Sequence, residues 1–319
     1  MVRPRQHLDK MKTWKVIHVH KADLALLLCL CLASLAIVGS SFHAAGQAGR
    51  RAHSGNEGAT VLNIVAIRDD KRGEPITGKQ VSLYDNGVEQ AIKSFSLDPS
   101  PARLVLLVDN SLTIRADVEK LEEATREFAY EIYEGDKLLI VGYDDQAEIV
   151  ADWTDDAAAI EKSLKSFRKK GDPHLFDALN AVAEEALRPL TGQKRAVVVV
   201  SDGLDRGSKT KFNEALTKLQ EMDITVYAVQ APDRTRGAMR RDVPKPVQVI
   251  DQLAAGTGGL VFPIDNARVA AKSICDELRK NRYVLAYSAS GIPFGDSRRL
   301  LVLGQTGITV RSKSAQPPN

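Results

Sequence analysis

The chain has 319 residues, of which 44% are hydrophobic, and this is enough to bury a substantial core and excludes a mainly disordered protein. Six Lys/Arg and two Asp/Glu lie in the first 48 residues, so the rest of the chain carries 38 basic and 39 acidic residues. This near-neutral balance argues against a general nucleic-acid-binding protein.

The first 48 residues indicate an export signal or a membrane anchor. An uninterrupted stretch of apolar and small residues runs from Leu24 to Val38, and basic residues precede it. The stretch is shorter than the ~20 residues that span a bilayer comfortably, but no formal charge follows until Arg50. Cleavage and retention both remain open. Either outcome predicts an exported protein of the periplasm or cell envelope, secreted or held at the membrane by this segment.

Cysteine usage indicates a fold that is stabilised by packing. Cys29 and Cys31 lie inside the apolar segment, which leaves Cys275 as the single thiol of the folded part. One thiol cannot form an internal disulfide. We expect Cys275 to behave as a small buried hydrophobic residue.

A small β module is expected at residues 61–100, after a polar linker at residues 49–60. Strand-like runs occupy Val61 to Arg68, Gln80 to Tyr84 and Val88 to Leu97. The last two runs flank an Asn-Gly pair, which is a strong hairpin signal. Pro99 and Pro101 mark the end of this module.

Residues 102–282 alternate between strand and helix patterns. The apolar run Leu104 to Val108 lacks polar alternation, as expected for a strand that is covered on both faces, and an amphipathic helix follows it from Val118 to Ile132. A second such run, Ala196 to Val200, lies further along. The alternation predicts an α/β fold, a doubly wound and mainly parallel sheet flanked by helices. Short strands at residues 283–311 are expected to pack back on the β module, and residues 312–319 to be disordered.

Oxygen-bearing side chains follow the first apolar run directly. Asp109, Ser111 and Thr113 occupy alternate positions where the strand should end and turn. Ligands of open α/β sheets bind beyond the carboxyl ends of the strands, and oxygen donors suit a hard cation such as Mg²⁺. The same residue types also cap helices, so this turn alone leaves both interpretations open.

A second acid strengthens the interpretation of a binding site. Asp202, in Ser201-Asp202-Gly203, follows the second apolar run as Asp109 follows the first. If the two strands are parallel neighbours, both carboxylates emerge at the same edge of the sheet. The sequence therefore predicts an oxygen-rich pocket there.

These residues resemble a von Willebrand factor type A (VWFA) domain, whose metal-ion-dependent adhesion site begins with Asp-x-Ser-x-Ser. Asp109, Ser111 and Thr113 match those positions, and Asp202 matches the family's aspartate after the fourth strand. Residues 171–179 are similar to the family's Gly-Gly-Thr-x-Leu-Tyr-Asp-Ala-Leu loop. The flanks, with Val-Ser-Leu-Tyr-Asp-Asn-Gly ahead and Arg-Tyr-Val-Leu-Ala-Tyr behind, are similar to the exported VWFA-related proteins frequent in Acidobacteria.

The resemblance implies a protein-binding, adhesion-type module with a degenerate site for Mg²⁺ or another divalent cation. Pro173 stands where the family has a threonine, so one usual ligand is missing, and Asp172 is a possible substitute. The expected partner is a protein that offers an exposed Asp or Glu to the cation. The residues expected to contact it are Asn110, Leu112, Pro173, His174 and Gly203.

Two other segments invite functional interpretation. Gly256 to Gly259 carries no phosphate-binding pattern and is expected to end a helix and turn, which is also typical of the family at this place. The basic loop after the strand Ile224 to Val229 contains Arg234, Arg236 and Arg240. We expect it to be a solvated loop rather than a contact for an anionic partner.

Two alternative functions remain besides adhesion. A metal-free structural scaffold of a cell-envelope complex would use the same fold without a cation. A phosphatase-like hydrolase would use Asp109 as nucleophile, but Ser111 stands where the general acid/base Asp of such enzymes would be. His174 is the only histidine beyond residue 53, which argues against a zinc site and a Ser-His-Asp triad. We therefore expect no enzyme activity.

Overall fold

The computed structural model describes residues 59–70, 74–165, 167–236, 238, 244–292 and 297–318. The segment Leu24 to Val38 lies outside these residues, so the expected export signal is not among them. No helix within the described ranges is long and apolar enough to cross a membrane. The described residues all belong to one compact unit.

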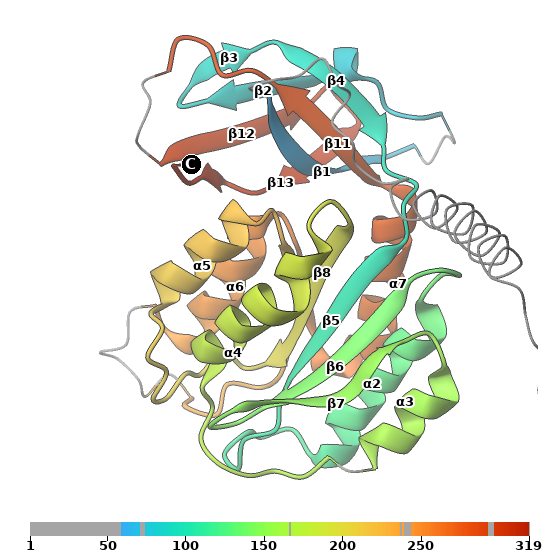
Figure 1. The fold of residues 1–319 in the computed structure, drawn as a ribbon, viewed down its shortest axis with the longest axis vertical. Coiled ribbons are helices and arrows are strands. Elements are labelled where there is room, and N and C mark those ends of the chain that lie inside the picture. Colours follow the sequence, from blue (N-terminus) through green and yellow to red (C-terminus); the bar gives the residue numbers. More distant parts are fainter. Residues whose placement is uncertain are drawn as a thin grey trace, which may run out of the picture. The chain divides into compact units, whose positions relative to one another are not determined.

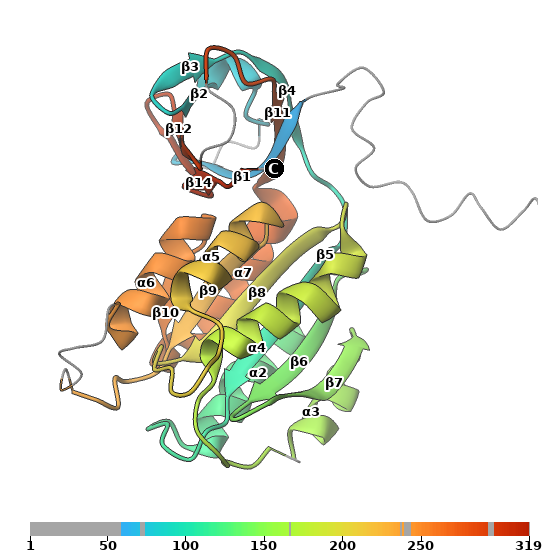
Figure 2. The ribbon, with the colours of Figure 1, turned by 60° about the vertical axis from the view of Figure 1, so that its left-hand side comes forward.

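A six-stranded sheet forms the centre of the α/β region, in the order β10-β9-β8-β5-β6-β7 (Figures 1 and 2). Its strands are β5 (Ala102–Asp109), β6 (Lys137–Tyr143), β7 (Ala147–Thr154), β8 (Lys194–Ser201), β9 (Thr225–Gln230) and β10 (Val261–Pro263). All neighbours pair in parallel except the edge strand β7, which pairs antiparallel with β6. The predicted doubly wound, mainly parallel sheet is confirmed.

Helices cover both faces of this sheet (Figures 1 and 2). One face packs against α2 (Val118–Glu131), α3 (Ala157–Leu164) and α7 (Ala267–Lys280). The other packs against α4 (Leu175–Ala181), α5 (Phe212–Glu221) and α6 (Pro246–Thr257). Short turns of other helix types complete the list: η1 (Gly78–Gln80), η2 (Val182–Leu187), η3 (Arg188–Leu190) and η4 (Ile264–Asn266). Of these, η2 is a π-helical turn that continues α4.

The central strand β5 shows why its sequence lacks polar alternation. Leu104, Leu106 and Val108 point into the core beneath α2 and α7, whereas Val105 and Leu107 point into the core beneath α4 and α6. All five are at most 1% exposed. A strand that is buried on both faces needs apolar residues at every position.

Both flanks of the chain build the β module, as the sequence predicts. One sheet has the order β13-β1-β11-β4 and the other the order β14-β12-β2-β3. The strands are β1 (Thr60–Arg68), β2 (Val81–Asp85), β3 (Val88–Gln90), β4 (Ile92–Leu97), β11 (Arg282–Tyr287), β12 (Arg298–Gly304), β13 (Ile308–Ser312) and β14 (Ala315–Gln316). The two sheets share one apolar core and curve around it (Figure 2).

Two expectations about this module need correction. The run Val88 to Leu97 is not one strand, because it divides into β3 and β4, which pair in different sheets. The C-terminal tail, expected to be disordered, contains β14, which pairs with β12. Lys313 in the tail is 3% exposed, and its Nζ donates to the Gln220 carbonyl at 2.8 Å. The tail is ordered because its backbone and this ammonium find partners.

Candidate functional site

The two predicted acids emerge at the place where an open α/β sheet binds its ligands. Within the sheet, the chain moves from β5 to β6 in one direction and from β8 to β9 in the opposite direction. The carboxyl ends of the neighbours β5 and β8 therefore form the topological switch point. Asp109 is the last residue of β5, and Asp202 directly follows β8. Parallel pairing of the two strands brings their carboxylates to one edge.

A chain of buried hydrogen bonds fixes Asp109. Ser111 donates to its Oδ1 through the backbone N–H at 3.0 Å and through Oγ at 2.5 Å. Ser201 Oγ donates to its Oδ2 at 3.2 Å and accepts the Tyr143 hydroxyl at 2.9 Å. Burial raises the pKa of Asp109, although Arg234 and Ser111 oppose that shift. Burial, together with the charge of Asp109, raises the pKa of Tyr143 well above its ordinary value.

The guanidinium of Arg234 joins the predicted site residues. Its Nη2 donates to Asp109 Oδ2 and, at 2.8 Å, to Asp202 Oδ1, while its Nε donates to Asp202 Oδ2 at 2.7 Å. Its Nη1 donates to Ser111 Oγ at 2.9 Å and to Thr113 Oγ1 at 2.7 Å. The structure thus brings together the four residues predicted to be metal ligands. They surround an arginine side chain that is only 5% exposed.

The burial of Arg234 corrects the expectation of a solvated basic loop for this residue. The loop that leaves β9 passes the end of the neighbouring β8, and there the Arg234 N–H donates to Asp202 Oδ2 at 2.9 Å. Burial alone would lower the pKa of Arg234, but the hydrogen bonds and charges of Asp202 and Asp109 raise it. Arg236, two residues further on, is exposed. No local pattern distinguishes these two arginines, so sequence reasoning missed the role of Arg234.

These residues, as arranged, do not fit a divalent cation. Each of the four expected ligands already accepts a hydrogen bond from Arg234. Pro173 offers no side-chain oxygen, and Asp172 is exposed with its N–H bound to Asp145 Oδ1 at 2.7 Å. In the described part of the chain, no group of three or more His, Cys, Asp or Glu residues is arranged to hold a metal ion. Binding of Mg²⁺ stays a prediction from the sequence.

The five residues expected to contact a partner differ in exposure. Leu112 is 64% exposed and the His174 side chain 24%. Asn110, Pro173 and Gly203 are buried, which removes them from the contact surface. Asn110 instead holds the loop together, because its Nδ2 donates to the Arg168 carbonyl at 3.2 Å. A Cβ on Gly203 would lie 2.1 Å from the Pro246 carbonyl oxygen, so Gly203 permits close packing.

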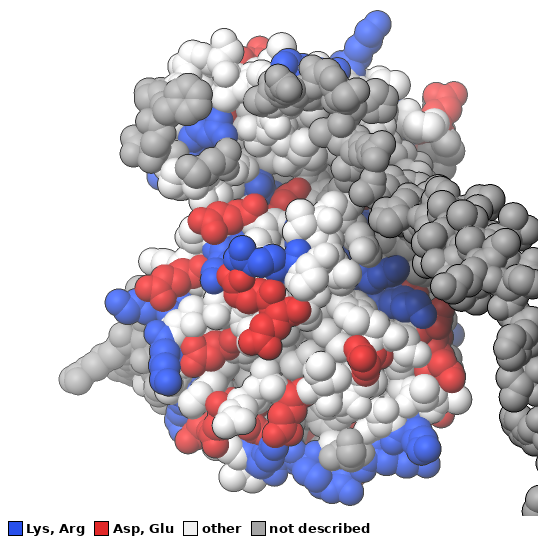
Figure 3. Space-filling model, viewed as in Figure 1, with Lys and Arg blue, Asp and Glu red and all other residues white. Residues whose placement is uncertain are grey.

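Exposed basic residues lie on the two loop segments that meet at Leu112. The Leu112 N–H donates to the Gly171 carbonyl at 3.1 Å and Lys169 Nζ to the Ile114 carbonyl at 2.9 Å, so residues 111–115 lie beside residues 168–171. Arg115 and Arg168, on these two segments, are exposed. Lys and Arg side chains gather along the lower margin of the α/β region (Figure 3). We call Leu112, Arg115 and Arg168 the rim.

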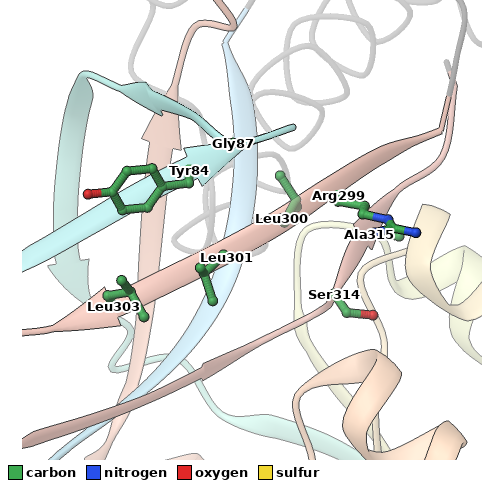
Figure 4. A pocket seen from close by; sticks show the side chains of 8 residues that line it. All are labelled: Tyr84, Gly87, Arg299, Leu300, Leu301, Leu303, Ser314 and Ala315. Atoms are coloured by element: carbon green, nitrogen blue, oxygen red, sulfur yellow. The ribbon is translucent and has the colours of Figure 1, made fainter.

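Two hollows of the described surface lie near the site or on the β module. One, of about 440 Å³, adjoins the site and is lined by residues of the loop after β8 and of α5 and α6, among them Gly203 and Phe212. The other, of about 590 Å³, lies on the β module. Leu301 and Leu303 of β12 line it together with Tyr84 of β2 (Figure 4). Leu301 is 53% and Leu303 45% exposed, so this face of β12 is apolar and open.

The fold and the site define a doubly wound α/β binding domain with carboxylates and hydroxyls at its switch point. Residues 104–205 match the family model of the von Willebrand factor type A domain. The chain therefore contains a VWFA domain, as its motifs predict. No curated protein matches the chain.

Three solved structures are distantly similar. An aerotolerance-related membrane protein from Bacteroides fragilis NCTC 9343, with multiple mutations to serines, is 20% identical, with 56% of this chain and 99% of that one covered and a TM-score of 0.44. A von Willebrand factor type A protein from Catenulispora acidiphila is 11% identical, with 83% and 75% covered and a TM-score of 0.46. The vWF domain of the type V pili tip protein Mfa5 from Porphyromonas gingivalis is 18% identical, with 34% and 40% covered and a TM-score of 0.31.

Proposed function

We propose that this chain is a protein-interaction module of the cell envelope, which binds its partner at the carboxyl edge of the VWFA sheet. The family match and the position of the site at the switch point support a binding role. The observation that carries the proposal is the rim, where Leu112 is 64% exposed beside the loop segments that build the site. The apolar segment Leu24 to Val38 supports the envelope location.

The chemistry of the rim supports a partner with both apolar and acidic groups. Leu112 offers an exposed apolar side chain, and the exposed residues Arg115 and Arg168 lie on the same two neighbouring segments. An arginine pairs with a carboxylate through two parallel hydrogen bonds. A partner Asp or Glu that flanks an apolar residue would satisfy both features.

Binding suits the site better than catalysis does. Asp109, which a phosphatase-like reaction would use as nucleophile, is 0% exposed, and its Oδ2 accepts a hydrogen bond from Arg234. Ser111 Oγ is held by Asp109 and Arg234, and Ser111 is also fully buried. A substrate would have to displace Arg234 to reach either group.

Site-specific photo-crosslinking in cells tests this proposal. A photoreactive residue at position 112 should crosslink to a discrete protein, and the substitutions Arg115→Glu and Arg168→Glu should abolish that product. The control carries the same residue at Val269 on α7, which is 58% exposed. The absence of a crosslink at position 112, or the same products at both positions, would contradict a contact at the rim.

The metal-free scaffold is the second candidate, and the apolar hollow on the β module favours it. Leu301 and Leu303 would then bury their exposed side chains against another component of an envelope complex. A photoreactive residue at Leu301 should in that case give the major crosslink, while position 112 gives none. N-terminal sequencing of the exported protein would show whether the segment before residue 49 is removed.

A further inference from the structure

Arg234 uses all of its hydrogen-bonding capacity inside the site. A guanidinium has five N–H donors and no acceptor. The five are directed to two carboxylates and two hydroxyls: Asp109, Asp202, Ser111 and Thr113. Both carboxylates are 0% exposed and the Arg234 side chain is 5% exposed. No donor is left over for water or for a partner.

The position of this cation matters because a divalent metal ion would need the same oxygens. Mg²⁺ requires oxygen ligands in near-octahedral geometry at about 2.1 Å, and carboxylates are its main protein ligands. Here both carboxylates are paired with a positive charge that lies within hydrogen-bonding distance of each. A second cation among these oxygens would be repelled by the guanidinium.

We propose that Arg234 is a built-in cation that replaces the divalent metal ion of this site. The guanidinium neutralises part of the charge of Asp109 and Asp202 and holds the turn at Ser111 and Thr113, so the edge of the sheet is organised without metal. The backbone supports this role, since the Arg234 N–H also donates to Asp202 Oδ2. Arg234 is therefore held both at its backbone and at its guanidinium.

An arginine whose N–H donors are all used and a metal ion with free coordination positions would interact differently with a partner. A metal ion keeps coordination positions that a partner carboxylate can fill, but Arg234 has no unused donor. A partner acid therefore cannot bind through Arg234, and its contacts lie on the rim. This last consequence rests on the proposed function, whereas the replacement of the metal does not.

Metal titration of the full chain in detergent tests the inference without any partner. We expect calorimetric titration of wild type with Mn²⁺ to give no binding, and the Tm to be the same in Mn²⁺, Mg²⁺ and chelator. Arg234→Ala empties the space between the carboxylates. This variant should have a lower Tm, and Mn²⁺ at about a hundredfold above Kd should raise it by about 5 °C.

Two further variants complete the design. Arg236→Ala, on the same loop but exposed, should behave as wild type in every condition. Arg234→Lys keeps a positive charge and should not acquire Mn²⁺ binding. Binding of Mn²⁺ by wild type would overturn the inference. The titration of wild type therefore tests the inference even if Arg234→Ala does not fold. A folded Arg234→Ala that responds to Mn²⁺ no more than Arg236→Ala would also overturn it.

Discussion

Arg234 and Asp202 form a buried bidentate pair across 32 residues of sequence. The guanidinium donates from Nε to Oδ2 at 2.7 Å and from Nη2 to Oδ1 at 2.8 Å, and both side chains are at most 5% exposed. Planar pairs of this kind are among the strongest hydrogen-bonded ion pairs in proteins. The pair connects the end of β8 to the loop after β9, so it stabilises the edge at which the site is built.

Loss of the Asp202 carboxylate should destabilise the fold strongly. Asp202→Ala leaves the buried Arg234 with only Asp109 as a charged partner, and breaking a buried pair costs roughly 3–5 kcal/mol. The free energy of unfolding from urea denaturation measures this loss. Asp172→Ala, at an exposed position, is the control and should change stability by less than about 0.5 kcal/mol. A loss below about 1 kcal/mol for Asp202→Ala would show that the pair is not formed.

Ser201 should contribute to stability, because its hydroxyl connects two buried donors to Asp109. Its Oγ accepts from the Tyr143 hydroxyl at 2.9 Å and from the Gly203 N–H at 3.0 Å, and donates to Asp109. Ser201→Ala removes the partner of two buried donors, so we expect a loss of roughly 1–3 kcal/mol in urea denaturation. Ser96→Ala, at an exposed position of β4, should be nearly neutral. Equal losses in the free energy of unfolding for Ser201→Ala and Ser96→Ala would contradict a stabilising role of these hydrogen bonds.

Lys194 should make stability depend on pH in the alkaline range. Its Nζ donates to the carbonyls of Asp98 and Leu278, both at 2.8 Å, and burial lowers its pKa to about 8. The unfolded lysine keeps its proton up to about pH 10.4, so between these values the unfolded state holds more protons and stability rises with pH. Below about pH 8 the cost of burying the charged ammonium is fully present.

The measurement compares wild type with Lys194→Met. We expect the free energy of unfolding of wild type to rise relative to this variant by roughly 2 kcal/mol between pH 7.5 and 9.5. The exposed Lys93→Met should keep a constant difference from wild type over the same range. A falling or flat difference for Lys194→Met would contradict the lowered pKa.

Gly258 should be intolerant of substitution because it combines two constraints. It ends α6 with φ +87°, and a Cβ would lie 2.8 Å from the Ser312 carbonyl carbon. Gly307 has a similar φ of +82° but nothing within 4 Å of its Cβ position. Gly258→Ala should therefore lose at least about 1 kcal/mol more than Gly307→Ala in thermal or urea unfolding. Similar losses would mean that β13 does not pack against the end of α6.

Much of the fold and part of the site could be predicted from local sequence. The apolar runs in β5 and β8 indicate strands that are buried on both faces, and Asp109 and Asp202 come directly after them. Strand direction then places both acids at one edge, because parallel neighbours end on the same side. The division of Val88 to Leu97 into β3 and β4 was not predictable in this way, since β3 forms a local hairpin with β2 whereas β4 pairs with β11, which is distant in sequence.

The amino-acid sequence by itself determined the doubly wound sheet, the small β module and the oxygen-bearing residues at the switch point, because periodicity and strand ends are local properties. Only the tertiary structure decided which cation those oxygens meet. Arg234 and Arg236 are alike in the sequence, and the path of the loop beyond β9 brings one of them between two buried carboxylates and leaves the other in solvent. An unpaired buried charge is costly, and the fold determines which residue of opposite charge lies close enough to pair with it.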